Sequence, residues 1–234
     1  MLLPTFSAKP VISRRDDFDP FELYPTIEIG SNTYTGQYNP RGFYKFADIR
    51  YGMPPTGERR FRKPEAVPDD VLLDHDGPRV CPQAVADWEC QRAANIELHR
   101  LSEGSGLNFT PDYFIDDCRR DQERMFMYPE TEDCLFLDVF VPATLFARDL
   151  SVCGDKLAPV AVTFGEEMYV RGFKAQTDGG YLTLMASRDI PSTGCGDEFI
   201  VSVAANFRLG MFGWLTDDDE SLNAGLLDQR LALE

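Results

Sequence analysis

Ser105, His75 and His99 are the side chains whose types could pair a nucleophilic serine with a histidine base. The sharp strand-to-helix turn that presents a hydrolytic serine has the pattern G-x-S-x-G, and no such pentapeptide occurs in the 234 residues. Ser105 lies in Gly104-Ser105-Gly106, which has a different spacing and falls in a polar stretch. Both histidines also precede every segment that could present them to such a serine. We therefore predict no catalytic serine–histidine pair from these residues.

The six cysteines favour disulfide bonds over a metal site. No two of them form a C-x-x-C pair, and only two histidines accompany them. Six cysteines allow fifteen pairings, so spacing alone selects none of them. Disulfides are typical of secreted proteins, and the glycosylation triplet at Asn108 fits a secreted surface loop, although such triplets also arise by chance. The cysteines are Cys81, Cys90, Cys118, Cys134, Cys153 and Cys195.

The composition is that of a folded and strongly acidic chain. Hydrophobic residues make up 43% and aromatic residues 12%, which are globular values. The net charge of −16 argues against nucleic acid or anionic lipid as a partner and is accounted for by solubility. No run of about 18 apolar residues is present, so no membrane span is predicted. The polar N-terminus also has no apolar core of the kind that a signal peptide needs.

Extended apolar runs define the elements that must position any site. Residues 1–25 predict an irregular lead-in, Thr26–Gly36 a small hairpin, and Gly42–Tyr51 a further extended run. Two later strand patterns are almost wholly apolar, as strands covered on both faces are. The remaining predicted strands and helices are Cys134–Val141, Pro159–Phe164 and Phe199–Ala205, and Gln83–Leu101, Pro111–Arg124, Thr183–Ser187 and Asn223–Glu234. The alternation of strand and helix predicts an α/β fold with a parallel, doubly wound sheet.

Five phrases occur in the order in which one enzyme family has them. They are Phe46–Phe61 (F-x-G-I-x-Y-A-x-P-P-x-G-x-x-R-F in the family), Cys81-Pro-Gln83 (its first disulfide cysteine), Thr131–Pro142 (S-E-D-C-L-x-L-N-V-x-x-P), Asn206–Leu215 (N-Y-R-x-G-x-F-G-F-L) and the closing helix Asn223–Glu234. On these phrases the chain resembles the type-B carboxylesterases, the family of cholinesterases and fungal lipases. The resemblance implies an α/β-hydrolase fold, with an N-terminal β-hairpin and a mostly parallel doubly wound sheet, and ester hydrolysis by a serine.

In that family the serine follows the closing helix, and the acid and histidine come later still. The resemblance therefore implies that residues 26–234 are the N-terminal portion of a carboxylesterase domain, which stops before the nucleophile elbow and is inactive alone. For a full-length form it implies a small-molecule or lipid ester as substrate, no cofactor, and secretion. The alternative is a non-catalytic, cholinesterase-like binding or adhesion protein, whose partner would be another protein.

The resemblance also assigns disulfides. Cys81 and Cys134 match the family's first disulfide, which would close a loop of 53 positions and contribute about 4 kcal/mol in the chain-entropy model. The other four cysteines could form one bridge nested in that loop and one that brackets the second strong strand, namely Cys90 with Cys118 and Cys153 with Cys195.

Two family ion pairs fall on matched phrases. Arg60 with Glu132 would tie the opening segment to the first long strand. Arg208 with Asp228 would tie a strand end to the closing helix. The alternative for these four charges is ordinary surface solvation.

The family's glycine-rich turn is altered. After the strand that matches Pro159–Phe164, the family has H-G-G-G-F, whose backbone N–H groups bind the oxyanion. An ungapped alignment places here Gly165, Glu166, Glu167 and Met168. The donors would fall near Glu167 and Met168, and two carboxylates would oppose a developing negative charge. The alternatives are a gap of one or two residues, or side chains that turn away from the donors.

The strand at Val160–Phe164 should have an exposed edge. In the family's sheet order it lies between Ile200–Ala204 and the strand that carries the nucleophile. An exposed apolar edge pairs with other chains, so we expect poor expression or aggregation.

Overall fold

The computed structural model describes most of the chain from Tyr24 to Glu234. The described residues are 24–71, 77–84, 87–102, 112, 114–116, 118, 128–147, 158–165, 168–186, 200–215 and 223–234. Several predictions fall outside these residues, namely those on Ser105, His75, Asn108, Cys153, Cys195, Glu166, Glu167 and most of the helix expected at Pro111–Arg124.

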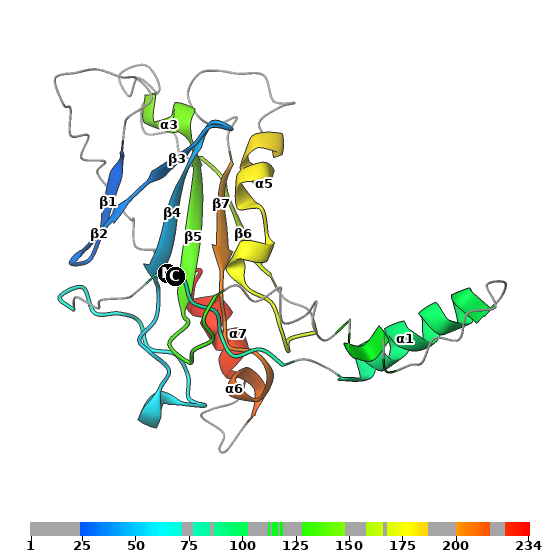
Figure 1. The fold of residues 1–234 in the computed structure, drawn as a ribbon. Coiled ribbons are helices and arrows are strands. Elements are labelled where there is room, and N and C mark those ends of the chain that lie inside the picture. The colour runs from blue at the N-terminus through cyan, green and yellow to red at the C-terminus, as the bar shows by residue number, and fades with distance from the viewer. Residues whose placement is uncertain are drawn as a thin grey trace.

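A mixed five-stranded sheet forms the centre of the described structure, in the order β3-β4-β5-β7-β6 (Figure 1). Only β6 and β7 are parallel, and the other three pairings are antiparallel. The strands are β3 (Gln37–Asn39), β4 (Phe43–Arg50), β5 (Phe136–Pro142), β6 (Val160–Phe164) and β7 (Val201–Ala205).

The predicted α/β fold is confirmed, and its parallel pairing is present at β6 and β7. The described sheet as a whole is mixed rather than mostly parallel. Strand direction is set by the connections. A short turn joins β3 to β4, which forces them antiparallel, whereas β6 reaches β7 through a helical crossover that permits a parallel pair. The apolar pattern of a strand's own residues does not indicate whether the strand runs parallel or antiparallel to its neighbours.

A hairpin covers one face of the sheet. Strands β1 (Thr26–Ile29) and β2 (Asn32–Thr35) pair antiparallel, with Thr26 opposite Thr35, as the sequence predicts. Ile27, Ile29 and Tyr34 of the hairpin pack against a buried cluster of β4, β5 and β7 side chains, which comprises Tyr44, Phe46, Ile49, Leu137 and Ala205. Burial of these apolar groups holds the hairpin on the sheet.

Helix α5 (Gly179–Ala186) covers the opposite face (Figure 1). Leu184 packs on a second buried cluster formed by Phe43, Phe140 and Ala204. A Cβ at Gly180 would lie 2.2 Å from the Phe43 ring, so this close helix–sheet contact needs glycine. The sequence prediction at Thr183–Ser187 thus placed the helix about one turn too late.

The remaining helices lie around the sheet. Figure 1 shows α6 and α7 close together beyond the end of β7, and α1 reaching outward from the body of the fold. They are α1 (Asp87–Ser102), α3 (Ala143–Ala147), α6 (Gly210–Trp214) and α7 (Ala224–Leu231), with short 3-10 helices at Gly57–Arg59 and Lys174–Gln176. Within the described residues, no helix has both the length and the apolar character that a membrane crossing requires.

Strand β6 is the last strand of the described sheet on its side and pairs there with β7. Val160 is 60% exposed. This arrangement agrees with the exposed edge that the sequence predicts.

Candidate functional site

The candidate site is the turn that follows β6, from Gly165 to Gly172, at the carboxyl ends of the parallel pair β6 and β7. Ligands of α/β sheets bind at this end of parallel strands. Met168 and Tyr169 have left-handed backbone conformations, with φ of 55° and 60°, and both side chains are largely exposed. Such conformations cost free energy in residues other than glycine, so other parts of the fold must hold the turn in place.

The two ends of the turn meet at Gly165. A Cβ at this position would lie 2.9 Å from the carbonyl oxygen of Phe173 and 3.2 Å from the Thr177 hydroxyl. Glycine is therefore needed to let the chain entering the turn pass the chain leaving it.

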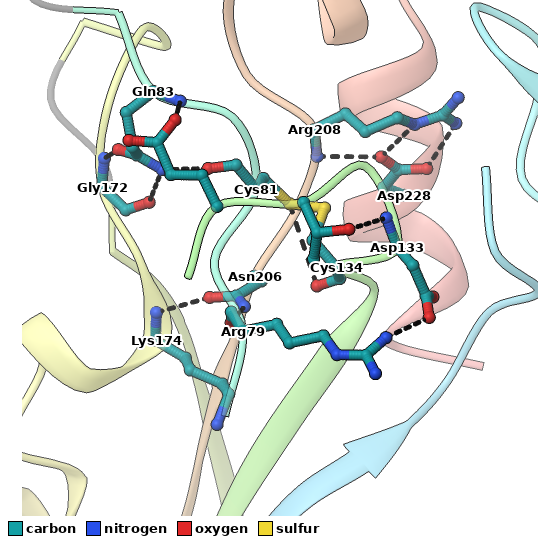
Figure 2. The surroundings of a disulfide bond; sticks show 12 residues. Arg79, Cys81, Gln83, Asp133, Cys134, Gly172, Lys174, Asn206, Arg208 and Asp228 are labelled. Carbon is teal, nitrogen blue, oxygen red and sulfur yellow. Dashed lines mark hydrogen bonds and ion pairs between the residues drawn. A yellow bond between two sulfur atoms is a disulfide. The ribbon is translucent and has the colours of Figure 1, made fainter. Parts of the chain in front are cut away.

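The segment that carries the first disulfide supports the turn from one side. Cys81 and Cys134 are bonded, as the resemblance implied, and both are buried. The Gln83 carboxamide accepts the Gly172 N–H at 2.6 Å and donates to the Gly172 carbonyl oxygen at 3.1 Å. The Ala84 N–H donates to the Val170 carbonyl at 2.8 Å. Figure 2 shows Gln83 reaching from the disulfide segment to Gly172.

Asn206, just after β7, holds the exit of the turn. Its Oδ1 accepts the Lys174 N–H at 2.7 Å, and its Nδ2 donates to the Arg79 carbonyl at 2.9 Å (Figure 2). The first of these hydrogen bonds is buried and so is shielded from water, and the second is partly buried. The Tyr169 carbonyl accepts the Gly210 N–H at 2.7 Å, and its ring meets Trp214 edge-on. The turn is thus fixed from β7 and α6 as well.

A cluster of buried charged side chains includes Lys174, which lies two residues after the end of the turn. Lys174 Nζ donates to Asp48 Oδ1 at 2.7 Å and to Asp138, while Lys45 Nζ lies 2.8 Å from the second Asp138 oxygen. Burial alone would raise the pKa of Asp138, but the charges of Lys174 and Lys45 outweigh it and lower that pKa below its usual value. A cavity of about 230 Å³ opens beside the cluster, and Tyr128 and Phe173 form part of its wall.

The cluster occupies two positions at which the quoted family phrases have uncharged residues. Asp48 stands at the glycine of F-x-G-I and has a φ of 57°, and Asp138 stands at the asparagine of L-x-L-N-V. Both carboxylates face Lys174, so their negative charges balance the positive charge of its buried ammonium group.

The two predicted ion pairs both form. Arg208 and Asp228 are 2% and 0% exposed, with two side-chain hydrogen bonds of 2.8 and 2.7 Å and a third from the Arg208 main-chain N–H at 3.0 Å. Burial raises the pKa of Asp228, and the hydrogen bonds from Arg208 partly offset this rise. Arg60 and Glu132 also form two hydrogen bonds but remain 44% and 22% exposed, so solvent weakens this pair.

The other predicted residues have different outcomes. Cys90 and Cys118 form the nested disulfide. Of the four residues proposed at the altered turn, Gly165 begins the turn and Met168 lies within it, while Glu166 and Glu167 lie outside the described residues. His99 is on α1, which projects from the body of the fold (Figure 1).

Sequence reasoning missed three supports of the turn. Gln83 and Asn206 lie inside matched phrases but received no role, and Lys174 was not considered. The signal for Lys174 was present in the two extra carboxylates, Asp48 and Asp138, which require a buried cation.

The sequence pattern of the carboxylesterase family matches residues 26–234. The chain belongs to the carboxylesterase family. Carboxylesterase patB of Penicillium expansum is 34% identical over 230 residues, which cover 90% of this chain and 39% of that protein. Neuroligin-2 of Mus musculus is 27% identical over 205 residues, which cover 81% of this chain and 21% of that protein.

A solved structure has a similar fold. The crystal structure of Aspergillus niger EstA matches with a TM-score of 0.56 and 26% identity over 90% of this chain and 31% of that one. The mixed sheet and its helices are accordingly part of an α/β-hydrolase fold. The chain spans 39% and 41% of the length of the patB carboxylesterases from two fungi.

Proposed function

We propose that this chain forms the oxyanion-binding side of a carboxylic ester hydrolase whose serine, acid and histidine are contributed by residues beyond these 234. The observation that carries the proposal is the turn after β6, which is held at the carboxyl ends of two parallel strands by Gln83, Asn206 and the Cys81–Cys134 disulfide. Membership of the carboxylesterase family supports the reaction class.

The chemistry would use the main chain of the turn. When a serine attacks an ester, the carbonyl oxygen becomes negative, and N–H donors that are already in place stabilise that charge without reorganisation. Successive N–H groups in a tight turn converge on an anion in this way. Without a G-x-S-x-G serine, the 234 residues would bind but not cleave an ester.

The substrate class in this proposal is a small-molecule or lipid ester, and the compartment is extracellular. The two disulfides support an oxidising environment.

A non-catalytic binding protein is the second candidate. The sequence has Glu166 and Glu167 where the family has glycines, and adjacent carboxylates disfavour an oxyanion. This candidate is the cholinesterase-like binding or adhesion protein that the sequence resemblance allows, and neuroligin-2 is among the similar proteins.

One experiment separates the two candidates. The coding sequence that follows Glu234 is read from the transcript, and the encoded polypeptide is expressed and assayed with p-nitrophenyl esters. A G-x-S-x-G shortly after the closing helix, with turnover that a serine-to-alanine variant abolishes, supports the hydrolase. A substituted serine and no turnover support the binding protein.

A further inference from the structure

The Gln83 side chain hydrogen-bonds to both peptide groups that flank the Gly172 α-carbon. A carboxamide has one acceptor oxygen and two N–H donors. In Gln83 the oxygen accepts the Gly172 N–H, and the nitrogen donates to the carbonyl oxygens of Gly172, at 3.1 Å, and Cys81, at 2.6 Å. The amide therefore contacts both peptide groups that meet at the Gly172 α-carbon, which restricts rotation about the φ and ψ bonds of this glycine.

The segment that carries Gln83 is anchored by a disulfide and by its own main-chain hydrogen bonds, whereas the turn depends on contacts from neighbouring segments. Cys81 is bonded to buried Cys134, and Val80 exchanges main-chain hydrogen bonds with Pro129 and Thr131, at 3.2 and 3.0 Å. In contrast, the turn holds two left-handed residues whose side chains are exposed. The paired hydrogen bonds from Gln83 to Gly172 thus form a clamp that connects a rigid segment to a strained one.

We propose that Gln83 is a positioning residue that sets the orientation of the turn after β6 through its paired hydrogen bonds to Gly172. This inference rests on the proposed function, since it is the turn's N–H groups that would receive the oxyanion. Gln83 acts on the peptide geometry of the turn and does not itself contact substrate.

The direct probe is the hydrogen exchange of the Gly172 amide, which donates to Gln83 Oε1. Residue-resolved exchange is measured on the 234-residue chain for the wild type and Gln83→Met, which has a similar length but no matching hydrogen bonds. Loss of the clamp should make Gly172 exchange about tenfold faster. Gln91→Met is the matched control because Gln91 is exposed on α1, and it should leave Gly172 unchanged.

Gln83→Glu tests the hydrogen-bond pairing itself, because the hydrogen-bonding groups of its side chain change with pH. A protonated carboxyl has one donor and one acceptor and can replace the amide at Gly172. In a carboxylate, the oxygen that stands in place of Nε2 would face the carbonyl oxygens of Gly172 and Cys81, whose repulsion should displace the side chain from the Gly172 N–H. Protection of Gly172 in this variant, relative to wild type at the same pH, should be lost at pH 7 and recover below about pH 4.

Other charged side chains lie next to Gln83 and Gly172. Glu130 accepts the Gln83 main-chain N–H, and Arg171, next to Gly172, pairs with Glu89 at 2.9 Å. They are present in wild type and in every variant, so comparison at the same pH removes their contribution.

Faster Gly172 exchange in Gln83→Met, with recovery of Gln83→Glu at acid pH, supports the assignment. Unchanged Gly172 exchange in Gln83→Met overturns it. If Gln83→Met does not fold, a Gln83→Glu protein whose Gly172 protection does not vary with pH overturns it instead. None of these outcomes depends on ester turnover, so the inference and the proposed function can fail separately.

Discussion

Replacing Asp228 with alanine should destabilise the chain strongly. Asp228 is fully buried and accepts hydrogen bonds from the Arg208 side chain and main chain, and Arg208 is 2% exposed. The variant would leave a guanidinium and a main-chain N–H buried with no carboxylate to accept them.

The magnitude follows from the burial of the pair. Breaking one partner of a buried ion pair costs about 3–5 kcal/mol. In a chain of this size each kcal/mol lowers Tm by about 2–4 °C, so Tm should fall by about 10 °C. Replacing both partners, as Arg208→Met with Asp228→Leu, should recover most of the loss because no buried charge is then left unpaired.

The assay is thermal unfolding followed by circular dichroism at pH 7. Glu234→Ala is the matched control, because Glu234 pairs with Arg230 of α7 at 3.1 Å but both side chains are more than half exposed. It should leave Tm nearly unchanged. If Asp228→Ala melts at the same temperature as Glu234→Ala, the buried pair of Arg208 and Asp228 does not stabilise the fold.

Three further predictions concern the stability at acid pH, the first disulfide and the exposed edge of the sheet at β6. The pKa of Asp138 is lowered on folding, so its contribution is full above about pH 4 and is lost as pH falls through the folded value. Below about pH 4, the Tm of Asp138→Asn should therefore fall less steeply with decreasing pH than the Tm of wild type. Equal slopes would contradict this. Removing the first disulfide as Cys81→Ser with Cys134→Ser should lower stability by about 4 kcal/mol in urea unfolding, and an unchanged midpoint would show that the bond is dispensable. Sedimentation should find the wild-type chain self-associating and Val160→Lys less so, because a charge on β6 opposes edge pairing; a monodisperse wild-type monomer would argue against an active edge.

Local patterns in the sequence predicted most of the elements. The alternation in Thr26–Gly36 gave the hairpin, and the apolar runs gave β5, β6 and β7, because these signals reside in neighbouring residues. Helix α6 was missed because its five residues include two glycines and show no helical period.

The supports of the turn could not be predicted in the same way. Lys174 meets Asp48 across 126 positions and Asp138 across 36, and such contacts depend on strand order. The amide of Gln83 gives no sequence signal of its partner, since its two contacts to Gly172 are to main-chain atoms 89 positions away. The disulfide and ion pairs were found through the family resemblance rather than from residue pattern.

The proposed function requires that these residues bind the oxyanion of an ester hydrolase and hold no nucleophile of their own. The most direct test is turnover of a p-nitrophenyl ester by the purified 234-residue chain, measured together with labelling by a fluorophosphonate probe that reacts with activated serines. We expect hydrolysis no faster than in buffer and no labelled serine. Saturable turnover and a label on a serine of this chain, both lost when that serine is changed to alanine, would contradict it.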